Sequence, residues 1–291
     1  MNALSDSRCE QISLRGLRYN IRHWGPADAP AVFFLHGWMD SSATFQFVVA
    51  ALHQEWHVIA PDWRGYGESE WLGRPYWFPD YYADLDALLA HFSPEQPTRL
   101  VGHSMGANIA ATYAGIRPQR VAQLAMLDFL GLKNNQPEEA PERLDQWLAQ
   151  VQGKPRLTSY PDFDALARRF VQSNPRLSAE RAAFLARHVG CTLADGRVQM
   201  ACDPWHRIPS ANLYRVEDSL ACWRQITAPV LMLVAGQGYI QERFGQHPEE
   251  FQRRLSAFPD VSVVHIDDAG HNVQHDQPER VAAALEAFLV R

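Results

Sequence analysis

Short apolar runs of four to seven residues alternate along this chain with longer segments that have helical spacing. Runs this short predict buried strands, because a buried helix needs about ten residues or more. Alternating strands and helices predict a mostly parallel sheet with helices on both faces, since parallel strands need a crossover connection. Two further runs near the N-terminus predict an edge hairpin, for about eight strands in all. The predicted strands are Glu10–Leu14, Leu17–Trp24, Ala31–Leu35, His57–Ala60, Thr98–Gly102, Val121–Leu127, Pro229–Ala235 and Val261–Ile266.

Helices are expected between these strands. Apolar residues recur at helical spacing in Tyr81–Phe92 and in Met105–Arg117. For the last helix we expect Asp276 to act as the N-cap, with Pro278 in the first turn. Glu279 stands three residues after Asp276, which is the spacing of a capping box.

The interval from residue 131 to residue 222 differs from its surroundings. It is rich in charge and proline, has a largely helical pattern and lacks the apolar runs found on both sides. Residues 1–130 and 223–291 are therefore expected to form one core, and residues 131–222 an inserted helical cap. Such a cap would lie over the carboxyl ends of the strands, where open α/β sheets bind ligands.

Composition excludes several classes of partner. With 291 residues, 46% of them hydrophobic, the chain can bury a large core without a structural metal. A net charge of −6 gives no reason to expect nucleic acid or an anionic membrane surface as a partner. The N-terminus has no apolar stretch of signal-peptide length, and no segment approaches the ~20 apolar residues of a membrane span. We therefore expect a soluble cytoplasmic protein.

The four cysteines are widely and irregularly spaced, at Cys9, Cys191, Cys202 and Cys222. No CxxC pair is present, so the sequence does not indicate a zinc site. Free thiols are expected, and a disulfide between Cys191 and Cys202 stays open as the less favoured alternative.

The segment Gly102-His-Ser104-Met-Gly106 has the pattern G-x-S-x-G. The pattern is short, but here a predicted strand precedes it and a predicted helix follows directly. This strand–turn–helix setting is that of a nucleophile elbow, in which a strained turn exposes the serine hydroxyl and small neighbours avoid clashes. The alternative is an ordinary glycine-rich turn.

A serine hydroxyl needs a base that removes its proton. Among the 12 histidines, His271 is distinguished by its position between the last strand and the last helix and by the glycine that precedes it. His36 and His103 are the alternatives, but each ends a strand and is expected to shape the pocket floor and contact substrate.

Two backbone N–H groups are expected to form an oxyanion hole. Trp38 follows the turn at the end of the first central strand, and Met105 follows the serine. Donors at these places stabilise charge that develops only in the transition state. Phe129, and Trp205 in the cap, are further candidates for contact with substrate, and the aromatic stretch 71–82 is expected either to line the pocket mouth or to pack between core and cap.

Four motifs in this order resemble the α/β-hydrolase superfamily with an inserted cap: HGW at residues 36–38, PDWRGYGES at 61–69, GHSMG at 102–106 and AGH at 269–271. The segments HGWMDSSATF and GHSMGANIA are similar to the serine hydrolase-like group within it. The resemblance implies esterase, lipase, amidase or related acyl chemistry without a metal or organic cofactor.

The acid of the expected triad departs from the family pattern. Superfamily members commonly carry it after the strand that resumes beyond the cap, where this chain has Tyr239. We favour Asp128, which ends a neighbouring strand and keeps the chain order Ser, Asp, His. Glu242 is the second choice. Asp267 and Asp268 are disfavoured, because a group three or four residues from His271 on the same loop seldom aligns with the far ring nitrogen. Another residue, or an incomplete triad, stays open as the remaining alternative.

The sequence therefore predicts a serine hydrolase that cleaves a small-molecule carboxylic ester, and leaves three alternatives open. A carbon–carbon bond hydrolase or an amidase would use the same Ser104, His271 and acid. A catalytically silent relative that binds a ligand is the alternative from another class. Dimerisation through the cap is possible.

Overall fold

The computed structural model describes residues 7–290 and contains a sheet of eight strands in the order β1-β2-β4-β3-β5-β6-β10-β11. The strands from β4 to β11 are parallel, while β2 pairs antiparallel with both β1 and β4. The predicted mostly parallel sheet with an edge hairpin is therefore confirmed. The strands are β1 (Arg8–Leu14), β2 (Leu17–Trp24), β3 (Ala31–Leu35), β4 (His57–Pro61), β5 (Thr98–His103), β6 (Val121–Leu127), β10 (Val230–Gln237) and β11 (Val261–Gly270).

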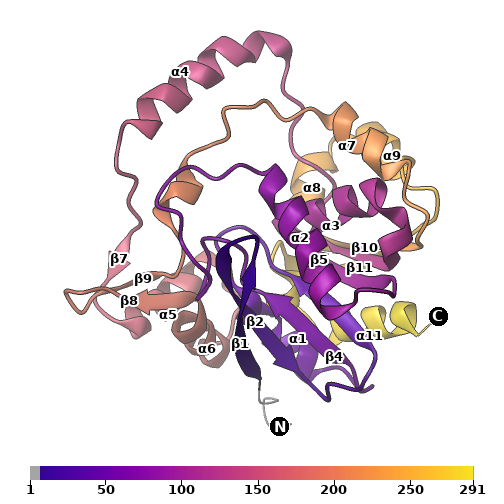
Figure 1. Cartoon of the computed structure of the whole chain (residues 1–291), viewed down its shortest axis with the longest axis horizontal. Helices are drawn as coiled ribbons and strands as arrows, with labels where there is room; N and C mark the ends of the chain where they lie inside the picture. Colours follow the sequence, from indigo (N-terminus) through magenta and orange to yellow (C-terminus); the bar gives the residue numbers. More distant parts are fainter. Residues whose placement is uncertain (1–6, 291) are drawn as a thin grey trace.

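Helices cover both faces of the sheet (Figure 1). Because successive strand residues point to opposite faces, Phe33 of β3 belongs to one buried cluster and Phe34 to the other. The first cluster includes residues of α2 (Pro79–Phe92), α3 (Met105–Ile116) and α7 (Val216–Trp223). The second includes residues of α1 (Gln46–Ala50) and α11 (Pro278–Leu289). Two apolar layers thus hold the strand ends, and the loops that follow them, in fixed positions.

The inserted segment, residues 131–222, is partly helical and partly β. It contains α4 (Ala140–Val151), α5 (Phe163–Ser173) and α6 (Ala179–Val189), together with a three-stranded sheet absent from the predicted pattern. Its strands, β7 (Ser159–Tyr160), β8 (Gly190–Thr192) and β9 (Val198–Met200), are too short to give an apolar run. In Figure 1, α4 lies away from the large sheet, and none of its side chains is buried. The segment contacts the core through α7, which packs against α3, and through α6 and the short turn Pro204–Arg207.

The expected capping box at the last helix is wrong. Asp276 ends a separate short helix, α10 (Val273–Asp276), and Gln277 occupies the N-cap of α11 without a side-chain cap hydrogen bond. The Asp276 carboxylate instead accepts hydrogen bonds from the Gly270 N–H at 2.7 Å and from the Asn174 amide at 2.6 Å. Those donors draw the carboxylate away from the helix end and toward the loop that follows β11.

The four cysteines are free thiols, so the alternative of a Cys191–Cys202 disulfide is wrong. Among the helices in residues 7–290, none is long and apolar enough to cross a membrane.

The glycines of the G-x-S-x-G turn are required by close packing. A Cβ on Gly106 would lie 2.0 Å from the Leu35 carbonyl oxygen, and one on Gly102 would lie 2.5 Å from the Ala107 nitrogen. Backbone atoms cannot move aside as the end of a flexible side chain can. We therefore expect Gly106→Ala to lower the free energy of unfolding by about 3 kcal/mol or more, measured by urea denaturation.

Gly236→Ala is the matched control, because a Cβ there has its nearest neighbour at 3.4 Å, an ordinary contact. Equal stability of the two variants would contradict the packing argument.

Candidate active site

Ser104 lies in a strained turn between β5 and α3. Its φ of 50° and ψ of −113° are rare for a residue with a side chain. The turn places the hydroxyl at the carboxyl edge of the sheet, beside the loop that follows β3. A Cβ on Gly37 in that loop would lie 3.3 Å from the Ser104 Cβ. Strain of this kind is typical of functional sites.

Ser104, His271 and Asp128 form a continuous hydrogen-bonded chain. The Ser104 Oγ lies 2.9 Å from His271 Nε2, and His271 Nδ1 lies 2.9 Å from an Asp128 carboxylate oxygen. His271 Nδ1 donates to the carboxylate, which leaves Nε2 as an acceptor for the serine proton. The structure therefore brings together the three residues favoured from the sequence.

Asp128 is fully buried at the end of β6 and has a positive φ of 48°. Its carboxylate accepts hydrogen bonds from the backbone N–H groups of Ala235, at 3.1 Å, and Tyr239, at 2.6 Å. These donors and His271 offset the cost of removing the charge from water. A Cβ on Gly238 would lie 2.2 Å from the carboxylate, so glycine is required there.

The alternative acid, Glu242, has an exposed side chain on α8 (Tyr239–Phe244). Tyr239, which stands where the family pattern places an acid, contributes its backbone to Asp128. Its hydroxyl donates to the Gly131 carbonyl at 2.9 Å, and its ring packs on Phe129.

His103 and Asp276 hold the loop that carries His271. His103 Nε2 lies 2.9 Å from the His271 carbonyl oxygen, and Asp276 accepts from the Gly270 N–H. Burial lowers the pKa of His103 well below its ordinary value, so the neutral ring donates through Nε2. His103 does not line the cavity beside Ser104, and its ring nitrogens face the His271 carbonyl and the Gln274 amide.

His36 also differs from its expected role. Its Nδ1 lies 2.8 Å from the Gly37 carbonyl oxygen, and its Nε2 accepts from the Trp63 N–H at 2.9 Å. The side chain is fully buried, and burial lowers its pKa to about 4. The neutral His36 ring thus links the chain after β3 to the chain after β4 through hydrogen bonds, and it does not face the cavity.

Trp38 and Met105 adjoin Ser104 at the sites expected for oxyanion donors. Met105 is the first residue of α3, and the first turn of a helix leaves N–H groups without an intrahelical acceptor. The Trp38 indole is 54% exposed and donates to the His206 carbonyl of the inserted segment at 3.3 Å. Both residues line the same cavity as Ser104.

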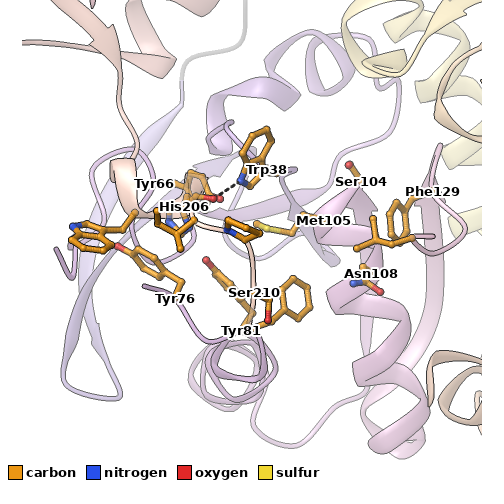
Figure 2. A pocket seen from close by; sticks show the side chains of 15 residues that line it. Trp38, Tyr66, Tyr76, Tyr81, Ser104, Met105, Asn108, Phe129, His206 and Ser210 are labelled. Carbon is orange, nitrogen blue, oxygen red and sulfur yellow. Dashed lines mark hydrogen bonds between the residues drawn. The ribbon is translucent and has the colours of Figure 1, made fainter. Parts of the chain in front are cut away.

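That cavity has a volume of about 380 Å³ and mostly aromatic walls (Figure 2). Phe129 and Trp205 line it, as expected from the sequence. His206 is stacked between Tyr66 and Tyr76, with ring centroids 3.9 and 3.7 Å away. The aromatic stretch 71–82 therefore does both things expected of it, lining the cavity and packing against the inserted segment.

Among residues 7–290, no cluster of three or more His, Cys, Asp or Glu side chains has an arrangement that could hold a metal ion.

Comparisons with known proteins identify the family of this chain. A family model described as alpha/beta hydrolase fold matches residues 30–278. The chain belongs to this family. It is 26% identical over 277 residues to a serine hydrolase-like protein of Danio rerio, a match that covers 91% of this chain and 83% of the relative. The predicted resemblance to the serine hydrolase-like group is therefore confirmed.

Two further similarities extend the comparison. The 2-(acetamidomethylene)succinate hydrolase of Mesorhizobium japonicum is 26% identical over 279 residues, covering 96% of this chain and 94% of that protein. The solved thioesterase domain from the curacin biosynthetic pathway superposes with a TM-score of 0.85 at 25% identity, covering 98% of this chain and all of that one. The family and its named members support hydrolase activity for this chain.

Asp40 was missed from the sequence. Its carboxylate accepts hydrogen bonds from the Ser41 N–H at 2.9 Å and from the Thr44 hydroxyl. Burial raises the pKa of Asp40 to about 7, from an ordinary value of 3.8. The half-buried carboxyl binds a proton that the unfolded chain loses at lower pH. Stability is therefore expected to fall as the pH rises from about 4 through about 7.

We expect Asp40→Asn to remove this dependence. The Tm of the variant, minus that of the wild type, should be larger at pH 8 than at pH 5, measured by calorimetry. Asp28→Asn, at an exposed carboxyl, serves as the control and should give the same difference at both pH values. An Asp40→Asn difference that does not change with pH would contradict the raised pKa of this carboxyl.

Proposed function

We propose that this protein is a serine hydrolase that cleaves carboxylic esters by two-step acyl transfer. The observation that carries the proposal is the chain of two 2.9 Å hydrogen bonds from Ser104 through His271 to Asp128. A binding protein needs no such alignment. The similarity to a thioesterase domain supports acyl chemistry, since a thioesterase also cleaves an acyl bond.

In the first step, Ser104 Oγ attacks the ester carbonyl carbon while His271 Nε2 takes the hydroxyl proton. The carbonyl oxygen becomes an oxyanion, which the backbone N–H groups of Trp38 and Met105 are placed to hold. As the tetrahedral intermediate collapses, the imidazolium gives its proton to the leaving alcohol. Asp128 holds the ring in the required tautomer and stabilises its positive charge, without taking the proton.

In the second step, a water molecule gives a proton to His271 Nε2 and attacks the acyl carbon on Ser104. The second tetrahedral intermediate collapses with return of the proton to Ser104, which releases the carboxylic acid. The mostly aromatic walls beside Ser104 favour a fairly apolar ester.

The first test is hydrolysis of p-nitrophenyl butyrate, followed by p-nitrophenolate absorbance. We expect Ser104→Ala to lower kcat by about 10⁴-fold or more, because the nucleophile is lost. Asp128→Asn should cost about 10⁴-fold, since the amide cannot hold the ring in the required tautomer.

Glu242→Gln is the matched control and should retain the wild-type rate, because this exposed side chain plays no part in the proposed relay. If Glu242→Gln lost most of its kcat while Asp128→Asn kept the wild-type value, the triad acid would be assigned to Glu242. A wild-type rate equal to that of Ser104→Ala would reject the esterase proposal, and an amidase, a carbon–carbon bond hydrolase or a ligand-binding protein would be tested next.

A further inference from the structure

A second cavity adjoins the active site on the other side of Trp38. It has a volume of about 340 Å³ and is lined by His271, Asn272 and His275 of the loop after β11, together with Asp40. The first cavity, lined by Ser104 and Met105, is called here the serine cavity, and the second the histidine cavity. Trp38 lines both.

A hydrogen bond holds the Trp38 indole, which borders both cavities, in position. Its Nε1 donates to the His206 carbonyl, and His206 is itself clamped between Tyr66 and Tyr76 (Figure 2). This hydrogen bond joins the loop after β3 to the inserted segment. The indole therefore forms part of the lining of two spaces of similar volume.

We propose that the two cavities divide the ester between them: the acyl part occupies the serine cavity and the leaving alcohol the histidine cavity. This inference rests on the proposed esterase function. In that reaction the acyl carbon becomes bonded to Ser104 Oγ, so the acyl part extends into the space that Ser104 lines. The leaving oxygen takes its proton from His271 Nε2 and must lie about 3 Å from it. The group attached to that oxygen therefore extends into the space that His271 lines.

The walls of the histidine cavity indicate what kind of alcohol it takes. Most of the inserted segment's contribution is apolar and comes from α5, α6, β9 and the turn between the two helices. Asp40 and His275 add hydrogen-bonding groups from the core side. The alcohol has a medium-sized apolar body, comparable in size to the acyl part. The side chains contributed by the inserted segment include Phe170, Leu177, Leu185, Val189 and Met200.

The same cavity serves the second step. Once the alcohol departs, the space beside His271 is free for the water that attacks the acyl enzyme. The acyl part stays in the serine cavity meanwhile, because it is bonded to Ser104. Separate cavities thus allow the alcohol to leave and water to enter without movement of the acyl chain.

The test uses two ester series that share methyl butyrate. One series varies the acid, as methyl acetate, methyl butyrate and methyl octanoate. The other varies the alcohol, as methyl, butyl and benzyl butyrate. Hydrolysis is followed by pH-stat titration with the wild type and with two variants. Met200→Trp narrows the histidine cavity, and Ile208→Trp narrows the serine cavity.

We expect Met200→Trp to lower kcat/KM for benzyl butyrate, relative to methyl butyrate, by about tenfold or more, and to leave the order of the acid series unchanged. Ile208→Trp should lower kcat/KM for methyl octanoate relative to methyl butyrate. It should leave the relative kcat/KM for benzyl butyrate unchanged. The opposite pattern, or equal effects of each variant on both series, would overturn the assignment while methyl butyrate hydrolysis upholds the esterase function. Wild-type failure on every ester would instead reject both proposals.

Enlarging variants test the same assignment if a tryptophan variant does not fold. Phe170→Ala widens the histidine cavity and should raise relative kcat/KM for benzyl butyrate. Ile208→Ala widens the serine cavity and should raise it for methyl octanoate. A rise in the other series for either variant would contradict the proposal.

Discussion

The buried carboxylate of Asp128 is the group on which the arrangement of the site depends. It carries no exposed surface, and a buried charge without partners would cost several kcal/mol. Two backbone N–H groups, from Ala235 and Tyr239, and one ring nitrogen, from His271, satisfy it. The ends of β6 and β10 and the loop after β11 are therefore coupled through one side chain, and His271 is aligned as a consequence.

The sheet could be predicted from the sequence because its strands are buried on both faces. Each gives an apolar run whose length separates it from a helix, as Ala31–Leu35 and Val121–Leu127 show. The strands of the inserted segment were missed for the opposite reason. Ser159–Tyr160 and Gly190–Thr192 are too short and too exposed to leave a pattern, and only their pairing with β9 makes them strands.

The residues placed correctly from the sequence are those whose position follows from a strand end. Ser104, Asp128 and His271 each follow a strand, so the topology alone brings them to one edge. The roles of Asp276 and His36 could not be read in this way. Asp276 has the spacing of a helix cap, yet its carboxylate accepts hydrogen bonds from the Gly270 N–H and from the Asn174 side chain of the inserted segment. His36 ends a strand beside the site, but backbone groups occupy both of its ring nitrogens.

The place of the acid follows from strand order rather than from position along the chain. In the sheet, β6 lies between β5, which leads to Ser104, and β10, which neighbours β11 and its histidine loop. An acid at the end of β6 is thus adjacent to both partners. With Asp128 there, the chain after β10 needs no side-chain acid and supplies the backbone N–H of Tyr239 instead. Tyr239 is compatible with this arrangement because its N–H, rather than its side chain, meets the carboxylate, while Gly238 leaves room for the carboxylate. A tyrosine where the family pattern places an acid is therefore consistent with an intact relay.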